Sequence, residues 1–111
     1  MAETYQVSLL LEECDRLIYD AVVEGSVTGE CIDRYQRSIP GGGSCVVVVY
    51  EKHYYRAGNR LTLTVTLDDF QGHTQVHCVG GGGGEGLFHF DWGAAESFSN
   101  VVREAVEPYL I

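Results

Sequence analysis

Residues Val79–Trp92 read V-G-G-G-G-G-E-G-L-F-H-F-D-W, and the rest of the chain is organised around this stretch. Glycine fills six of the seven positions in Gly80–Gly86. Large aromatic residues then occupy every second position of Leu87–Trp92, a period of two that is typical of a strand. The stretch therefore predicts a glycine-rich loop followed by a short strand.

The chain after this stretch predicts a helix. Its apolar residues recur at helical spacing and form one stripe, which consists of Ala94, Phe98, Val101, Val102, Ala105 and Tyr109. We expect Gly93 or Asp91 to cap the start of this helix, because such residues satisfy free backbone N–H groups there. Pro108 is expected to end regular helix just before it.

Two strands and a tight turn are predicted immediately before the glycines. Leu61–Leu67 alternates strictly between leucine or valine and threonine, and His73–Val79 alternates in the same way after a turn at Gln71 and Gly72. If these two residues form a two-residue turn, the facing pairs are Leu67 with Val76, Val65 with Cys78, Thr66 with His77, and Asp68 with Gln75. One face of the predicted hairpin is then apolar and the other polar.

The stretch Cys45–Arg56 is the most strand-like run in the chain. Four successive valines, Val46–Val49, make both faces apolar, which predicts a central strand covered on both sides. Val27–Ile39 predicts the preceding strand, and the glycines of Pro40–Ser44 predict the turn between the two.

The N-terminal region predicts a first strand and a first helix. Thr4–Leu11 begins with polar and apolar alternation. From Glu12 the period becomes helical, and Gly25 is the expected stop, so a helix is predicted over Glu12–Glu24.

The element order β-α-β-β-β-β-β-α predicts an α+β fold. We expect a two-layer sandwich in which an antiparallel meander sheet of five to six strands carries two helices on one face. The order resembles that of helix-grip folds in element order alone. Residues 1–111 are expected to form a single domain, with Pro40–Ser44 and Gly80–Gly86 at opposite ends of the sheet.

The chain is acidic, with 16 acidic and 7 basic residues and a formal net charge of −9. This charge repels phosphate backbones and anionic lipid, so we expect neither nucleic-acid nor membrane binding.

The sequence contains no signal peptide and no apolar run long enough to span a bilayer, which predicts a cytoplasmic protein. Its four cysteines are then expected to be reduced and none forms a C-x-x-C pair: Cys14, Cys31, Cys45 and Cys78.

The glycine run does not qualify as a nucleotide-binding loop. It satisfies G-x-G-x-x-G trivially, but a strand is predicted after it where the phosphate-binding pattern requires a helix, and no Lys-Ser or Lys-Thr follows. We interpret Gly80–Gly86 as a flexible hairpin loop or a place where backbone packs closely, with an anion-cradling role as the functional alternative.

A candidate ligand site combines the glycine run with polar residues of the last strands. Its members are Gly81, Gly83, Glu85, His77, His89 and Asp91. Two histidines and a carboxylate are a familiar metal-ligand set, but the spacings match no metal motif, so we assign no metal and leave the cofactor unknown. No catalytic residue is assigned, because the alternation places Cys78 on the core face, opposite to His77, and no G-x-S-x-G motif is present.

The valine run points to self-association. If helices cover one face of the sheet only, the second apolar face of Val46–Val49 needs another cover. A second copy of the chain would supply it as a homodimer, and folding of the first strand or of Tyr109–Ile111 over this face is the alternative.

Four motifs resemble a family of small bacterial proteins of unknown function, found mainly in Clostridia-type Gram-positives. They are V-V-Y-E-K-H-Y at Val48–Tyr54, L-T-V-T-L-D at Leu63–Asp68, V-H-C-V-G-G-G-G-G-E-G at Val76–Gly86, and F-D-W-G-A-A-E-S-F at Phe90–Phe98. The resemblance covers most of the chain after the first helix, and Met1–Gly43 adds little to it. It implies a bacterial cytoplasmic domain and implies no site.

Two functions follow as hypotheses. The first is a small non-enzymatic binding or interaction module that forms a homo-oligomer through the sheet. The alternative is a small-ligand-binding protein or enzyme with its site near Gly80–Gly86 and the polar face of His77, His89 and Asp91.

Overall fold

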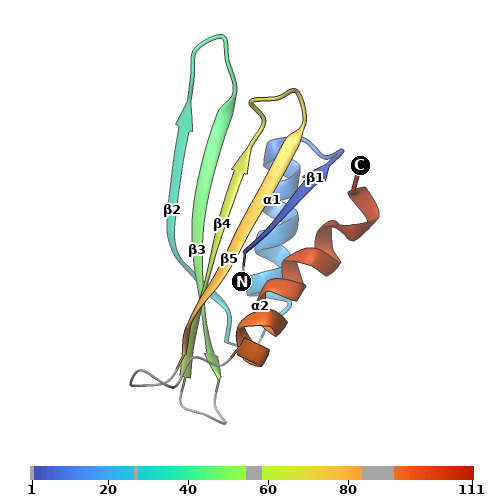
Figure 1. Ribbon diagram of the computed structural model, residues 1–111. Coiled ribbons are helices and arrows are strands. Elements are labelled where there is room, and N and C mark those ends of the chain that lie inside the picture. The colour runs from blue at the N-terminus through green and yellow to red at the C-terminus, as the bar shows by residue number, and fades with distance from the viewer. Residues whose placement is uncertain (1, 27, 55–58, 84–91) are drawn as a thin grey trace.

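The computed structural model describes residues 2–26, 28–54, 59–83 and 92–111. Its helices and strands are, in chain order, β1 (Ala2–Val7), α1 (Leu11–Tyr19), a π-helical turn (Asp20–Glu24), β2 (Glu30–Ser38), β3 (Ser44–Tyr54), β4 (Asn59–Asp68), β5 (Thr74–Gly83), α2 (Trp92–Val106) and a 3-10 turn (Glu107–Tyr109). The five strands form one sheet, and both helices lie on the same face of it (Figure 1). The predicted α+β class, with two helices on one face of an antiparallel sheet, is confirmed.

The strand order differs from the expected simple meander. The strands lie in the order β1-β5-β4-β3-β2, and all neighbours are antiparallel. The strands from β2 to β5 do form a meander, but β1 pairs with β5 at the opposite edge from β2. The chain passes from β1 at one edge to β2 at the other by way of α1. The connection between these two strands therefore supplies one of the helices that cover the sheet.

The hairpin between β4 and β5 has the predicted register. Leu67 pairs with Val76, Thr66 with His77, and Asp68 with Gln75. The expected two-residue turn is wrong, because five residues separate the end of β4 at Asp68 from the start of β5 at Thr74. Gly72 has a φ of 88°, which a glycine adopts without a steric penalty.

The helices bury the faces that their periodicity indicates. In α1 and the π-helical turn, Leu11, Cys14, Ile18 and Val22 are buried, which agrees with the helix expected over Glu12–Glu24. In α2 the buried residues are Phe98, Val102 and Val106. The helix ends at Val106, close to Pro108 as expected. Gly93 is not its cap because it lies inside the helix, and Asp91 lies outside the described residues.

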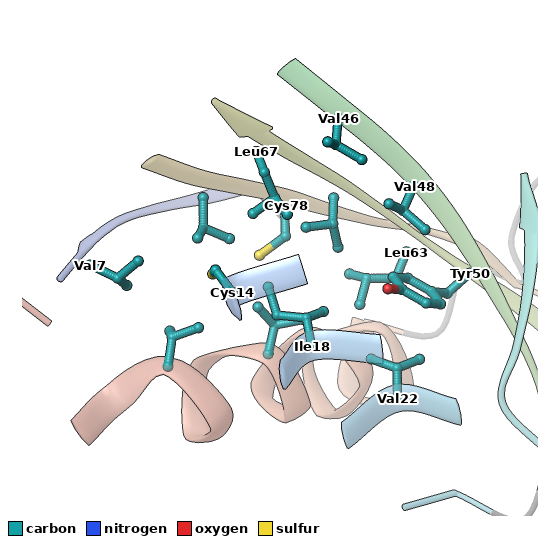
Figure 2. Packing of buried hydrophobic residues seen from close by; sticks show 14 of the residues in the cluster. Val7, Cys14, Ile18, Val22, Val46, Val48, Tyr50, Leu63, Leu67 and Cys78 are labelled. Carbon is teal, nitrogen blue, oxygen red and sulfur yellow. The ribbon is translucent and has the colours of Figure 1, made fainter. Parts of the chain in front are cut away.

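One hydrophobic core lies between the helices and the sheet. Figure 2 shows side chains of β3, β4 and β5 pointing toward the helices, with Cys14, Ile18 and Val22 pointing back toward the sheet. Along β4 the leucines and valine of Leu61–Leu67 are at most 1% exposed. Each fully buried aliphatic side chain of this kind contributes about 1.5–3 kcal/mol.

Within the described residues, the helices cover the valine run of β3 on one side only, and the expected cover on the second side stays a prediction. Val46 and Val48 face the helices and are 1% exposed, whereas Val47 and Val49 lie on the opposite face and are half-buried. Neither predicted intramolecular cover is present on that face. The strand β1 is a member of the sheet, and Ile111 donates its N–H to the carbonyl of Gln6 at 3.0 Å, beside β1.

The predicted strand Leu87–Trp92 falls largely outside the described residues. Only Trp92 is described, and it is the first residue of α2. The expected separation of the two glycine-rich segments is confirmed as far as the structure describes them. The backbone N–H of Ser44 donates a hydrogen bond to the Asp69 carboxylate at one end of the sheet, while Gly83 pairs with Arg60 at the other.

Candidate functional site: the open face of the sheet

We call the side of the sheet that faces away from the helices the open face. Strand pairing arranges its residues in rows that cross all five strands. One central row consists of Thr4, His77, Thr66, Val47 and Tyr35. The next consists of Ala2, Val79, Thr64, Val49 and Asp33. These two rows form the centre of the open face, and among the described residues no helix or loop lies over them (Figure 1).

The centre of the open face is nearly free of charge and combines apolar with uncharged polar residues: three valines and Ala2 lie among three threonines, His77 and Tyr35. Val47 and Val49 lie half-buried between neighbouring strands, while Val79 is 37% exposed and Tyr35 is 53% exposed. Asp33, at the β2 edge, is the one acidic or basic residue in the two rows. The adjacent rows of the same face are charged, because they contain Asp68 and Arg37 on one side and Glu51 on the other.

His77 is the one predicted ligand residue in these rows. The Thr4 hydroxyl lies 2.8 Å from Nδ1 of His77, and this hydrogen bond links β1 to β5 on the open face. This hydrogen bond orients the imidazole ring through Nδ1. The other ring nitrogen, Nε2, takes no part in it. The ring is thus oriented by a residue 73 positions away in the sequence.

The other five predicted ligand residues divide into two groups. Gly81 and Gly83 belong to the end of β5, where they pair with Thr62 and Arg60. The remaining three lie outside the described residues: Glu85, His89 and Asp91. The proposed grouping of His77 with His89 and Asp91 therefore stays a prediction.

Gly82 confirms the close backbone packing predicted for part of the glycine run. Its φ is 84°, and a Cβ atom built on it would lie 2.5 Å from the carbonyl oxygen of Arg60. No side chain fits at that distance without a shift of β4. The glycine at this position is therefore explained by the approach of two strands.

The buried cysteines are poor nucleophiles. Cys14 and Cys78 are fully buried in the core, where Figure 2 shows them between the sheet and α1. Burial raises the pKa of Cys14 to about 12 and that of Cys78 to about 11, because the thiolate is poorly solvated there. Cys78 faces away from His77, as predicted. All four cysteines are free, and all four lie within the described residues.

The described residues include no group of three or more histidine, cysteine or carboxylate side chains that could hold a metal ion. In the same residues, no helix has the length and apolar character needed to cross a membrane.

The contribution of β2 to this surface was not predicted from the sequence. Asp33, Tyr35 and Arg37 share the open face because they pair with Val49, Val47 and Cys45. The alternation was present in the sequence, since Arg34 lies on the opposite face and forms an ion pair with Asp15 of α1. The mixture of charges on both sides of β2 concealed which side faces the helices.

A comparison with protein families matches residues 1–110 to a family of unknown function (DUF6054). The chain therefore belongs to this family, and the family assigns no activity to it. The resemblance to proteins of unknown function is confirmed at this level. No curated protein and no solved structure matches the chain.

Proposed function

We propose that this protein is a non-enzymatic interaction module that binds a second copy of itself through the open face of its sheet. The observation that supports it most is the half-buried pair Val47 and Val49, which lies on the side of the sheet away from both helices. An antiparallel sheet can leave one face to water, but that face is then usually polar. Three incompletely covered valines, Val47, Val49 and Val79, at the centre of such a face favour a protein partner.

The charge distribution favours a second copy as this partner. Two chains that each carry a net charge of −9 repel one another at most orientations. The centre of the open face is the exception, because its two rows contain one charged residue between them. Contact through this surface keeps most of the acidic side chains of both copies in water.

The size of the face approaches that of a standard dimer interface only when its charged outer rows are included. Strands lie about 4.8 Å apart and residues on one face repeat every ~6.8 Å, so the two central rows give a flat area of about 330 Å², and four rows, which add Asp68, Arg37 and Glu51, give about 650 Å². A standard interface buries about 800 Å² on each partner, and side-chain relief adds to the flat area. Two sheets packed face to face at about 10 Å would bury the valines and threonines together.

We also propose that the module is bacterial and acts in the cytoplasm. The motif resemblance, strongest in Val76–Gly86 and Phe90–Phe98, supports a bacterial origin. Four free cysteines, two of them deep in the core, support a reducing compartment.

Sedimentation equilibrium with one open-face variant tests the self-association. The wild type is expected to have a mass that is twice 12.2 kDa or a multiple of this. Val79→Lys, which places a charge on the exposed part of the face, is expected to halve that mass. The matched control is Leu10→Lys, because Leu10 is 66% exposed and precedes α1 away from the open face.

The outcomes separate clearly. A wild type that sediments as a monomer at all concentrations would contradict the proposal. So would a dimer that Val79→Lys leaves intact. Circular dichroism of both variants establishes that the substitutions have not unfolded the chain.

A small-ligand site around His77 is the second candidate function, favoured by the orientation that Thr4 imposes on the imidazole. Native mass spectrometry of the purified protein tests it. A small molecule retained by the wild type and absent from His77→Ala would support the site. A wild type without any bound molecule would contradict it.

A further inference from the structure

The edge strand β2 offers a second surface that goes beyond the proposed open-face contact. It is the outermost strand of the sheet, and within the described residues no segment pairs with its outer side. Figure 1 shows it standing clear of both helices toward the tip of the β2–β3 hairpin. The other edge is different, because Leu110 forms a bridge with Val7 of β1.

The hydrogen bonds of the β2–β3 hairpin establish which backbone groups are free. Ile39 donates its N–H to the carbonyl of Gly43 at 2.9 Å, so this pair is hydrogen-bonded across the hairpin. Hydrogen-bonded and non-hydrogen-bonded pairs alternate along an antiparallel ladder, and the register is continuous from Asp33 to Ser38. Arg34, Gln36 and Ser38 therefore turn their N–H and C=O groups to the free edge.

When β2 of a second copy pairs with this edge in antiparallel orientation, the outward N–H and C=O groups of one strand must lie opposite the outward groups of the other. Even-numbered residues then face even-numbered residues, which requires a symmetric register to be centred on a single residue; the three registers nearest the middle of the continuous ladder are centred on Arg34, on Tyr35 or on Gln36. Registers centred between two residues are excluded, because they would place outward groups of one strand opposite inward groups of the other.

Charge complementarity selects the register centred on Tyr35. In this register Asp33 faces Arg37 of the second copy, and Arg37 faces Asp33, so two ion pairs flank the two tyrosines. The register centred on Arg34 places this arginine opposite itself. The register centred on Gln36 places Asp33 opposite Ile39 and forms no pair of opposite charges.

The side chains are already arranged for the Tyr35 register. Asp33, Tyr35 and Arg37 share the open face, and Arg37 donates a hydrogen bond to the Tyr35 hydroxyl at 2.9 Å. Arg34 is engaged on the opposite face by Asp15. Residues Glu30–Ser38 include two acidic and two basic residues, so β2 has no net charge although the chain has −9.

We infer that two copies of this chain pair edge to edge through β2, antiparallel and centred on Tyr35. The resulting sheet has helices of both copies on one side and their open faces on the other. The register shift between Cys31 and Asp33 interrupts the regular hydrogen bonding of β2. The contact between the two copies is therefore limited to the stretch after this shift. Combined with open-face association, the two contacts give an assembly of four chains.

Disulfide cross-linking measures the register directly. Residues at the centre of a non-hydrogen-bonded pair have Cα atoms about 4.5 Å apart, within the range that a disulfide spans. Tyr35→Cys is therefore expected to give a cross-linked dimer when diamide takes up the two thiol hydrogens. Gln36→Cys is the matched control, because in this register position 36 faces Arg34 and not itself.

Both variants are made with Cys31→Ser and Cys45→Ser, which removes the two half-buried thiols. At least about tenfold more cross-linked dimer from Tyr35→Cys than from Gln36→Cys is expected. Equal cross-linking of the two variants, or none from Tyr35→Cys, would overturn the inference.

A charge exchange tests the ion pairs independently. Arg37→Asp places two carboxylates opposite each other and is expected to weaken the edge contact about tenfold. Adding Asp33→Arg restores opposite charges and should return the association to the wild-type level. Failure of the double variant to recover would mean that Arg37→Asp acted through folding and that the register is wrong.

These readouts are independent of the open-face proposal. Val79→Lys should halve the mass of the wild type yet leave cross-linking of Tyr35→Cys unchanged, since position 79 lies on β5. Loss of cross-linking in Val79→Lys would show that only one interface exists.

Discussion

The two faces of the sheet are made by the same strands but have different constraints. On the covered face, the residues of Leu61–Leu67 in β4 are leucine and valine and are at most 1% exposed. On the open face, the alternate residues of the same stretch are threonines, all half-buried, with Arg60 and Asp68 at the two ends of the strand. Threonine and valine have similar shapes and both favour strands, so either serves the pleated backbone. What distinguishes the faces is the requirement of the covered one for hydrophobic contact with α1 and α2.

The largest expected difference between the faces comes from neighbouring residues of β4. Leu63→Ala should lower the free energy of unfolding by about 2–5 kcal/mol, because it leaves a cavity in the core. Thr64→Ala, on the open face, should cost less than about 1 kcal/mol. Urea denaturation at low protein concentration measures both. An equal cost for the two would mean that the open face is as tightly packed as the core.

A pair of glycines at the end of β5 sharpens the comparison. Gly82→Ala is expected to cost about 1–3 kcal/mol, because the φ of 84° and the carbonyl of Arg60 both oppose a side chain. Gly81→Ala meets only the Thr62 hydroxyl, at 3.1 Å, and should cost less. The same denaturation experiment compares them. A Gly81→Ala variant less stable than Gly82→Ala would contradict this account of the glycine run.

The pH dependence of stability reports on the covered face. Burial raises the pKa of Cys14 and Cys78 from 9.0 to about 12 and about 11. The folded-state pKa of each thiol lies above its unfolded-state pKa, so the two buried, protonated thiols contribute to the free energy of unfolding. This contribution is fully present below pH 9.0 and is lost as the pH rises toward 11 and 12. The urea midpoint should therefore fall between about pH 8 and about pH 10. The fall in the urea midpoint should be smaller in Cys78→Ala than in the wild type. An equal fall would show that ionisation of Cys78 does not cause it.

The smallest expected difference compares two threonines where β1 meets β5. Thr74 is 2% exposed and donates a hydrogen bond to the carbonyl of Leu9 at 2.7 Å, so Thr74→Val should cost about 1–2 kcal/mol. Thr4→Val breaks the exposed hydrogen bond to His77 and should cost about 0.5 kcal/mol or less. Thermal unfolding of both variants tests the order. A reversed order would mean that His77 has a larger structural role than its exposure implies.

The candidate site was predictable only in part. The register of β4 with β5 placed His77 opposite Thr66 and away from Cys78, because strict alternation permits one pairing. Thr4 as the hydrogen-bond partner of His77 was not predictable, since it depends on β1 pairing with β5 across most of the chain. Tyr35 and Arg37 were missed for a related reason: their importance comes from the position of β2 at an edge.

The sequence by itself determined the local features: two amphipathic helices, the alternating strands, and the register of the last hairpin. Each depends on a periodicity of neighbouring residues, which the sequence states directly. Only the tertiary structure decided that β1 lies beside β5, that β2 is left as a free edge, and that Val47 and Val49 have no cover from the helices. These depend on contacts between segments far apart in the chain. Several strand orders can bury the same apolar faces, so periodicity does not distinguish among them.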